Sequence, residues 1–247
     1  MTSLNELLNS LQPVEIKGAT EVSILRICCD SRQVEKGSLF FALRGGKLDG
    51  NRFVREAVQR GAVAVVTDSG EVRVPSGICL LHVGDARRSM AMTASVFYGH
   101  PTRSVQLVGI TGTNGKTTTS YILHSIFRAR QECAGLIGTI ECLIGDRSIP
   151  SQNTTPESVQ LQGYLAELRD QGCLRAVMEV SSHALEMHRV DGCHFRVAVF
   201  TNLTRDHLDF HQTMDRYFDA KRKLFYGVES PPPEWAVLNL DDDHGAR

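Results

Sequence analysis

The segment GITGTNGKTTTS, at residues 109–120, restricts the possible folds more than any other part of the chain. It follows an apolar, strand-like run at residues 104–110 and opens a run with helical spacing that continues to about residue 130. A strand, a glycine-rich turn and a Gly-Lys-Thr sequence at the start of a helix form the arrangement that surrounds a triphosphate. The strict pattern G-x-x-x-x-G-K-[ST] requires glycine where this chain has Ile110, so the match is incomplete by one residue.

The residue types of this segment each suit a phosphate site. Gly112 and Gly115 allow backbone conformations and close approaches that a Cβ atom would block. Lys116 can reach the β- and γ-phosphates, and the Thr117 hydroxyl can bind Mg²⁺. An ordinary glycine-rich turn, the alternative, leaves the Gly-Lys-Thr-Thr junction unexplained. The predicted ATP-binding residues are Gly112, Thr113, Asn114, Gly115, Lys116, Thr117 and Thr118.

The composition argues against several other classes of protein. A net charge of −1 does not suit nucleic-acid binding, which needs a basic surface. No apolar run approaches the roughly 18 residues of a membrane span, so we expect no membrane insertion. The amino-terminal segment lacks the basic flank and apolar core of a signal peptide, and its leucines at positions 4, 7, 8 and 11 have helical spacing. Seven scattered cysteines without an export signal predict reduced thiols in a cytoplasmic protein.

Two regions with different patterns meet near residue 100. Residues 1–100 predict a small α/β domain, with strands at 38–43, 62–67 and 77–83 and a helix at 49–61. Residues 101–247 predict a P-loop domain with a doubly wound, mostly parallel sheet. Its strands are expected at 104–110, 174–180, 195–201 and 234–240, and a helix at 156–172. The helix after the glycine loop is expected to bury Ile122, Leu123, Ile126 and Phe127. The end of the chain directly after a strand and an acidic turn predicts a truncated protein.

Polar residues stand where three of these strands end. Parallel pairing would bring Thr111, Glu179 and the Thr201-Asn202 pair together beside the predicted phosphates, because ligands bind at the carboxyl ends of strands in such sheets. Glu179 is then placed to serve as a carboxylate ligand of Mg²⁺. The alternative, a solvated or capping glutamate, fits less well because the surrounding run is apolar.

The segment TRDHLDFH, at residues 204–211, follows the third of these strands. His207 and His211 stand four residues apart, which allows three interpretations: a zinc pair, a polar helix start, or one histidine that completes the Mg²⁺ site. Lys221, in AKRKLF, would by default lie on a solvated helix face.

Several segments together resemble the Mur ligases, the ATP-dependent amide-forming enzymes that build the peptidoglycan stem peptide. The resemblance is greatest to the members that add the third amino acid. It rests on TGTNGKTTT in the loop and on five further segments: DSRQVEKGSLFFALRGGKLDG (30–50), NTTPES (153–158), MEVSSHALEMHRV (178–190), FTNLTRDHLDFH (200–211) and AKRKLF (220–225).

The resemblance implies a role for each matching residue. Lys116, His207 and Lys221 would be catalytic. Mg²⁺ would be bound by Thr117, Glu179, His207 and, as a carbamylated lysine, Lys221. The substrate-binding residues would be Ser31, Gly46, Lys47, Leu48, Asn153, Thr154, Thr155, Ser181 and Arg189. The chain departs from some relatives at Met187, where they have Gln. The resemblance also implies a third domain that binds the incoming amino acid, which we expect to be missing from this sequence.

The implied reaction joins a diamino acid to UDP-MurNAc-L-Ala-D-Glu through an acyl phosphate, with ATP and Mg²⁺ as cofactors, in a monomeric enzyme. One alternative is a non-catalytic module that binds the UDP-muramoyl peptide and ATP. A P-loop GTPase or kinase is a weaker alternative, because the guanine signature Asn-Lys-x-Asp is absent. The identity of the diamino acid is not predicted.

Overall fold

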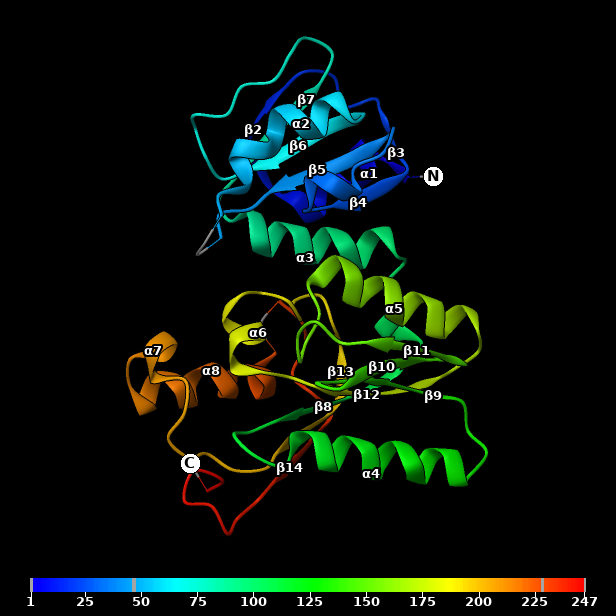
Figure 1. Ribbon diagram of the computed structural model, residues 1–247, viewed down its shortest axis with the longest axis vertical. Helices are drawn as coiled ribbons and strands as arrows, with labels where there is room; N and C mark the ends of the chain where they lie inside the picture. Colours follow the sequence, from blue (N-terminus) through cyan, green and yellow to red (C-terminus); the bar gives the residue numbers. More distant parts are fainter. Residues whose placement is uncertain (1, 46–47, 228, 247) are drawn as a thin grey trace. The chain divides into compact units, whose positions relative to one another are not determined.

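The computed structural model describes residues 2–45, 48–227 and 229–246 and divides the chain into two compact units, Met1–Phe97 and Tyr98–Arg247 (Figure 1). The boundary expected from the sequence lies three residues further along. In the described parts of the chain, no helix is both long and apolar enough to cross a membrane.

The first unit is built on a five-stranded sheet in the order β2-β7-β6-β5-β4. Its strands are β2 Pro13–Lys17, β4 Arg26–Cys28, β5 Ser38–Ala42, β6 Ala62–Thr67 and β7 Cys79–Val83, and β1 Thr2–Ser3 pairs separately with β3 Ser23–Ile24. The helices are α1 Leu4–Leu11, α2 Val54–Gln59 and α3 Ala86–Phe97, with 3₁₀ turns η1 Ser31–Gln33 and η2 Gly50–Phe53. The three predicted strands are confirmed, whereas the helix expected over residues 49–61 is split between η2 and α2.

The second unit contains a seven-stranded sheet in the order β11-β10-β9-β12-β8-β13-β14. The strands are β8 Gln106–Thr111, β9 Ala134–Ile137, β10 Glu141–Ile144, β11 Arg147–Pro150, β12 Arg175–Glu179, β13 Phe195–Phe200 and β14 Trp235–Leu238. Strands β9, β12, β8, β13 and β14 pair in parallel, and β10 and β11 continue the sheet as antiparallel hairpins. The predicted α/β class with a mostly parallel sheet is confirmed.

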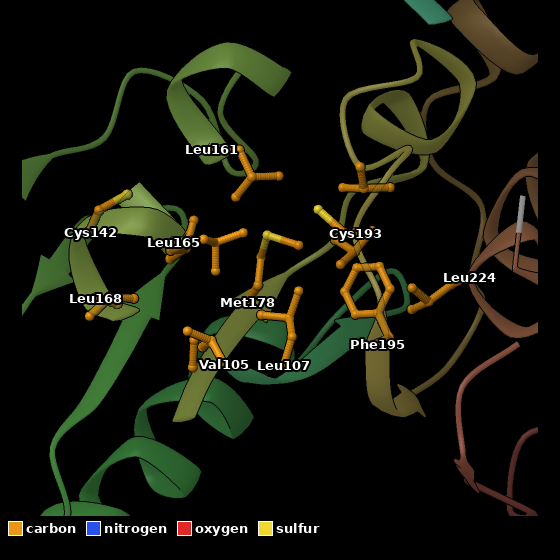
Figure 2. Close-up of a cluster of buried hydrophobic side chains, with 14 of the residues drawn as sticks. Val105, Leu107, Cys142, Leu161, Leu165, Leu168, Met178, Cys193, Phe195 and Leu224 are labelled. Atoms are coloured by element: carbon orange, nitrogen blue, oxygen red, sulfur yellow. The ribbon is translucent and has the colours of Figure 1, made fainter. Parts of the chain in front are cut away.

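Helices cover both faces of this sheet. They are η3 Pro101–Arg103, α4 Lys116–Ala129, α5 Ser158–Asp170, α6 Ser182–Glu186, α7 Leu208–His211 and α8 Met214–Tyr226. Leu161 and Leu165 of α5 pack on Leu107 and Met178 on one face (Figure 2). Side chains of α4 pack on the next residue of β8, Val108, on the other face. Successive side chains of the central strands point to opposite faces, so each face of the sheet buries apolar side chains against a helix.

One prediction about α4 is wrong. Leu123 and Phe127 pack against the sheet, but Ile122 and Ile126 are 57% and 50% exposed. The side chains buried on that face include the polar Ser120 and His124. An apolar pattern alone misjudges the rotation of the helix, because two residues of the buried face are polar.

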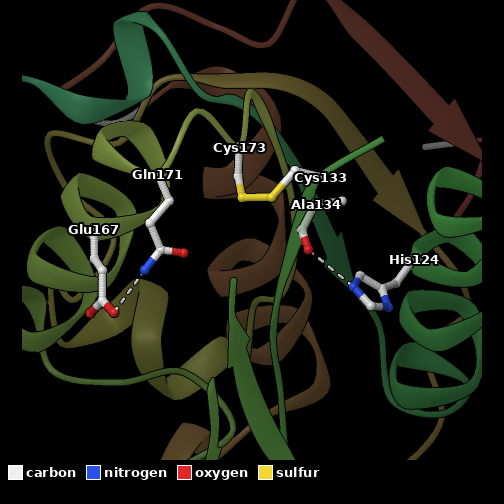
Figure 3. The surroundings of a disulfide bond; sticks show 6 residues. All are labelled: His124, Cys133, Ala134, Glu167, Gln171 and Cys173. Carbon is white, nitrogen blue, oxygen red and sulfur yellow. Dashed lines mark hydrogen bonds between the residues drawn. A yellow bond between two sulfur atoms is a disulfide. The ribbon is translucent and has the colours of Figure 1, made fainter. Parts of the chain in front are cut away.

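The cysteine prediction also needs correction. Cys133 and Cys173 form a disulfide, with their Cα atoms 4.6 Å apart (Figure 3), and the other five cysteines are not disulfide-bonded. Cys133 directly precedes β9 and Cys173 precedes β12 by two residues. Since Ala134 lies opposite Arg175 in the parallel ladder, the sheet brings the two sulfurs together across 40 residues of sequence. Spacing in the sequence gives no sign of this pairing.

Candidate functional site

The glycine loop connects the end of β8 to the start of α4, as the sequence predicts. Gly112 has a φ of +145°, and a Cβ atom there would lie 1.9 Å from the hydroxyl of Thr201. Gly115 has a φ of +84° at the amino-terminal end of α4. This conformation therefore excludes larger residues at Gly112, and it leaves the first backbone N–H groups of α4 available to an anion.

The end of β13 holds the loop from the other side. The Asn202 amide accepts a hydrogen bond from the Asn114 N–H at 2.9 Å and donates one to the Asn114 carbonyl at 3.1 Å. The Thr201 hydroxyl donates to the same carbonyl at 2.7 Å. Asn202 was expected only to stand near the phosphates. Its function as a support for the loop depends on contacts between residues 88 positions apart, which the sequence does not reveal.

Two lysines converge on the loop. Lys116 donates to the carbonyl oxygens of Gly112 and Thr113 at 2.8 and 2.9 Å, and Lys221 of α8 donates to Gly112 at 2.9 Å. Lys221 is only 2% exposed. Burial, followed by the positive charge of Lys116, lowers the pKa of Lys221 to about 7. Burial likewise lowers the pKa of Lys116. Lys221 is thus a buried amine with a large neutral fraction near pH 7, not a solvated surface lysine.

A buried carboxylate lies beside the loop. Glu179 ends β12 next to β8, is 0% exposed, and accepts a hydrogen bond from the Thr117 hydroxyl at 2.8 Å. It also accepts bonds from the backbone N–H and the hydroxyl of Thr139 at 2.9 and 3.0 Å. Thr139 was not predicted as a site residue. A hydroxyl in contact with a carboxylate offers the oxygen ligands that Mg²⁺ prefers, so Thr117 and Glu179 fit this ion.

The two histidines of the TRDHLDFH segment have different surroundings. His207 precedes α7, and its ring lies 4.9 Å from that of His183 and 6.1 Å from that of Tyr217. His211 is buried, with Nε2 placed 2.9 Å from the hydroxyl of Ser182. Among the described residues no three His, Cys, Asp or Glu side chains form a group that could hold a metal. The zinc-pair interpretation therefore has no support here.

Tyr217 of α8 lies between His207 and the glycine loop. It was not predicted as a site residue. Its hydroxyl lies 3.2 Å from that of Thr113, and the Lys221 amine lies 4.4 Å from the centre of its ring. The structure thus places His207, Lys221 and the glycine loop around one aromatic side chain. A buried tyrosine between charged helix residues gives no distinctive signal in the sequence.

The NTTPES turn lies against the carboxyl end of β12. The Thr155 hydroxyl is buried and donates to the Glu179 carbonyl at 2.8 Å, while it accepts from the Ser181 N–H at 3.1 Å. The Thr154 and Thr139 hydroxyl oxygens lie 3.1 Å apart, and Asn153 is exposed. The structure therefore brings the predicted substrate turn and the buried carboxylate together.

Arg189 is held near this turn. Its guanidinium donates to the Thr155 carbonyl at 3.0 Å and lies 2.7 Å from the Glu157 carboxylate. Its buried Nε–H has no hydrogen-bond partner among the residues that the structure describes. The sulfur of Met187 lies 4.0 Å from the guanidinium. Arg189 thus retains one donor for a further acceptor.

In the first unit, Ser31 and Leu48 line a cavity of about 570 Å³. The Ser31 hydroxyl donates to Glu56 at 3.1 Å, and Arg32 and Arg87 also line the cavity. Gly46 and Lys47, predicted to belong to the same site, lie outside the described residues. The carboxylates of Asp30 and Glu56 line the same cavity, and Arg32 pairs with Asp30 at 2.7 Å, so the cavity offers both acidic and basic groups to a ligand.

Comparisons with known families agree with both units. The family model described as Mur ligase middle domain matches residues 110–247, which is more than half of the chain. The chain belongs to the Mur ligase family. A second model of the Mur ligases, described as the catalytic domain of the family, matches residues 23–98.

Individual Mur ligases resemble the chain over nearly all of its length. The UDP-N-acetylmuramoyl-L-alanyl-D-glutamate–2,6-diaminopimelate ligase of Geobacter sulfurreducens is 49% identical over 248 residues, covering 99% of this chain and 48% of the relative. A solved structure with the same ligase name has a TM-score of 0.82 and 31% identity, covering 99% of this chain and 48% of the other. MurF of Thermotoga maritima, solved in complex with ADP, shares the fold, with a TM-score of 0.54 and 23% identity over 83% of this chain and 43% of that one. The chain spans about half the length of the curated relatives it matches.

Proposed function

We propose that this chain provides the ATP-binding and UDP-substrate-binding parts of a cytoplasmic ligase that joins a diamino acid to UDP-MurNAc-L-Ala-D-Glu. The observation that supports this most strongly is the convergence of Lys116, Lys221 and the Thr117–Glu179 pair on one glycine loop. The name of the Geobacter sulfurreducens relative indicates the substrate, with 2,6-diaminopimelate as the amine.

The reaction needs charge neutralisation more than a protein nucleophile. The D-Glu carboxylate attacks the γ-phosphate of ATP, ADP leaves, and the amine of the diamino acid then displaces phosphate from the acyl phosphate. Lys116, which now donates to loop carbonyls, would turn its N–H groups to the phosphate oxygens and stabilise the developing charge. Bound Mg²⁺, held by Thr117, Glu179 and His207, would supply further positive charge.

Lys221 would act in a modified form. A neutral amine attacks CO₂ and releases a proton to give a carbamate, which converts the lysine side chain into an anion. The low pKa of Lys221, caused by burial and by Lys116, makes the neutral amine available near pH 7. The resulting carboxylate would be an oxygen ligand for a second Mg²⁺ beside the loop.

The remaining predicted residues would bind the UDP-muramoyl dipeptide. Ser31, Gly46, Lys47 and Leu48 would contact its UDP end, for which the cavity in the first unit has suitable donors. Asn153, Thr154, Thr155, Ser181 and Arg189 would contact the muramoyl-dipeptide end. Arg189 suits a carboxylate there because its guanidinium is planar and its Nε–H, which has no partner among the described residues, can take part in a bidentate hydrogen bond.

The test is incubation of the chain with ATP, Mg²⁺, UDP-MurNAc-L-Ala-D-Glu and either diaminopimelate or lysine, followed by mass spectrometry. A product heavier by one diamino acid residue would demonstrate ligase activity in this chain. Binding of ATP and the UDP compound without product would support the alternative, a non-catalytic binding module. If the chain bound neither compound, both proposals would be wrong.

A further inference from the structure

The turn between β9 and β10 lies directly against the Glu179 carboxylate. At Gly138, a Cβ atom would lie 2.3 Å from the carboxylate oxygen Oε1 of Glu179, so a side chain at this position would clash with the carboxylate. The next residue, Thr139, donates its backbone N–H to Oε1 at 2.9 Å and its hydroxyl to Oε2 at 3.0 Å. Both carboxylate oxygens are therefore fixed by this one turn, in a space that only glycine leaves open.

Thr139 also reaches the substrate turn. Its hydroxyl oxygen lies 3.1 Å from that of Thr154. A threonine hydroxyl has one proton, and an ionised carboxylate only accepts hydrogen bonds. The Thr139 hydroxyl is within donor distance of both Glu179 and Thr154, and its single proton can serve only one of these two acceptors at a time. Thr139 therefore stands between the substrate turn and the carboxylate and can donate to either one.

Thr139 itself is exposed, whereas Glu179 is completely buried. The Thr139 side chain is thus not needed to fill the core. Its bonds can be removed without leaving a cavity, so its effect on the carboxylate can be separated from an effect on folding.

We propose that Thr139 is a positioning residue that orients Glu179 for the metal–nucleotide complex and couples this site to the substrate turn through Thr154. This inference rests on the proposed function, because it presumes that Glu179 binds the ion that accompanies ATP. Groups that orient metal ligands by hydrogen bonds contribute substantially to metal affinity. Coupling between two sites is reciprocal, so each ligand changes the affinity for the other by the same factor.

The test compares Thr139→Val, which has nearly the same shape but no hydroxyl, with Thr139→Ser, which keeps the hydroxyl. Mn²⁺ affinity is measured by electron paramagnetic resonance in the presence of AMPPNP, a non-hydrolysable ATP analogue. We expect Thr139→Val to bind Mn²⁺ about tenfold more weakly and Thr139→Ser to stay within about twofold of the unsubstituted chain. Gly138→Ala, which pushes on Oε1 from the backbone side, should weaken Mn²⁺ binding as well.

A second measurement addresses the coupling. The affinity for UDP-MurNAc-L-Ala-D-Glu is determined with and without Mn²⁺–AMPPNP. The ratio of these two affinities should move closer to one in Thr139→Val and stay unchanged in Thr139→Ser. Unchanged Mn²⁺ affinity and unchanged coupling in Thr139→Val, while the unsubstituted chain binds both ligands, would overturn this proposal alone. Failure of the unsubstituted chain to bind Mn²⁺–AMPPNP would overturn the proposed function together with it.

Discussion

Lys116 and Lys221 donate hydrogen bonds to the same acceptor, the carbonyl oxygen of Gly112, at 2.8 and 2.9 Å. Two amines that meet at one oxygen in a buried place cannot both keep a full charge at little cost. Of the two amines, that of Lys221 is the more deeply buried. Burial and the charge of Lys116 lower its pKa to about 7. The loop thus contacts two lysines with different properties: Lys116 is suited to bind phosphate, and Lys221 is suited to react as a neutral amine.

Lys221 should form a carbamate. In ¹³C-bicarbonate at pH 8, where the neutral amine dominates, the chain should show a carbamate carbon signal in the NMR spectrum. The signal should weaken as the pH falls below 7 and disappear in Lys221→Arg, because a guanidinium stays protonated. Lys223→Arg, on the same helix, is the control and should keep it. A signal that survives in Lys221→Arg would show that another amine is modified.

Asn202 should contribute to nucleotide binding without touching the nucleotide. Asn202→Ala removes two hydrogen bonds that hold Asn114, each worth about 1 kcal/mol, so ATP affinity should fall by up to about thirtyfold. Asn9→Ala, an exposed site on α1, should have no effect. Calorimetric titration with Mg²⁺–ATP measures both variants, and equal affinities would contradict the supporting role of Asn202.

His124 should make the chain less stable in acid. It is 8% exposed, its Nε2 lies 3.1 Å from the Ala134 carbonyl (Figure 3), and burial lowers its pKa below the ordinary 6.5. Below pH 6.5 the unfolded chain binds the proton more readily than the folded chain, so stability falls as the pH drops from 6.5 through the folded pKa.

Urea unfolding at several pH values between 5 and 8 measures this effect. In His124→Gln, whose amide can still reach the carbonyl, the loss of stability in acid should be smaller. His194→Gln, a half-buried site in the same unit, should leave the loss unchanged. An identical acid dependence in His124→Gln and the unsubstituted chain would show that His124 is not responsible.

The Cys133–Cys173 disulfide should be detectable by counting thiols. Denatured without reductant, the chain should react as five thiols, and as seven after reduction. Closing a loop of about 40 residues stabilises by about 4 kcal/mol in the chain-entropy model, so reductant should lower the urea midpoint. Cys133→Ser should show the same midpoint with and without reductant. Seven thiols without reduction would contradict the disulfide.

The sequence predicted what depends on local pattern. The glycine loop, the central parallel strands and the polar residues at their ends follow from periodicity and from the glycine-lysine-threonine sequence. The parallel strand β9 and the antiparallel strands β10 and β11 were not predicted, because each is only four residues long and its pairing is set by the neighbouring sheet. Ile122 and Ile126 were misplaced because Ser120 and His124 share the buried face of α4.

The supporting contacts could not be predicted from sequence. Thr139, Asn202 and Tyr217 act on residues 40, 88 and 104 positions away, so only the folded chain shows their partners. The same holds for Cys133 and Cys173. Residue types at strand ends indicated where the site lies, whereas the hydrogen bonds that orient it depend on the register of the sheet.

The central claim is that this loop binds ATP with Lys116 at the phosphates, and calorimetric titration of Mg²⁺–ATP into the chain and into Lys116→Ala tests it most directly. Lys36→Ala, in the first unit, is the matched control. We predict saturable binding by the unsubstituted chain and by Lys36→Ala, and at least about a hundredfold weaker binding by Lys116→Ala, because a charged contact to phosphate worth about 3 kcal/mol is lost. No binding by the unsubstituted chain, or equal binding by Lys116→Ala, would contradict the account.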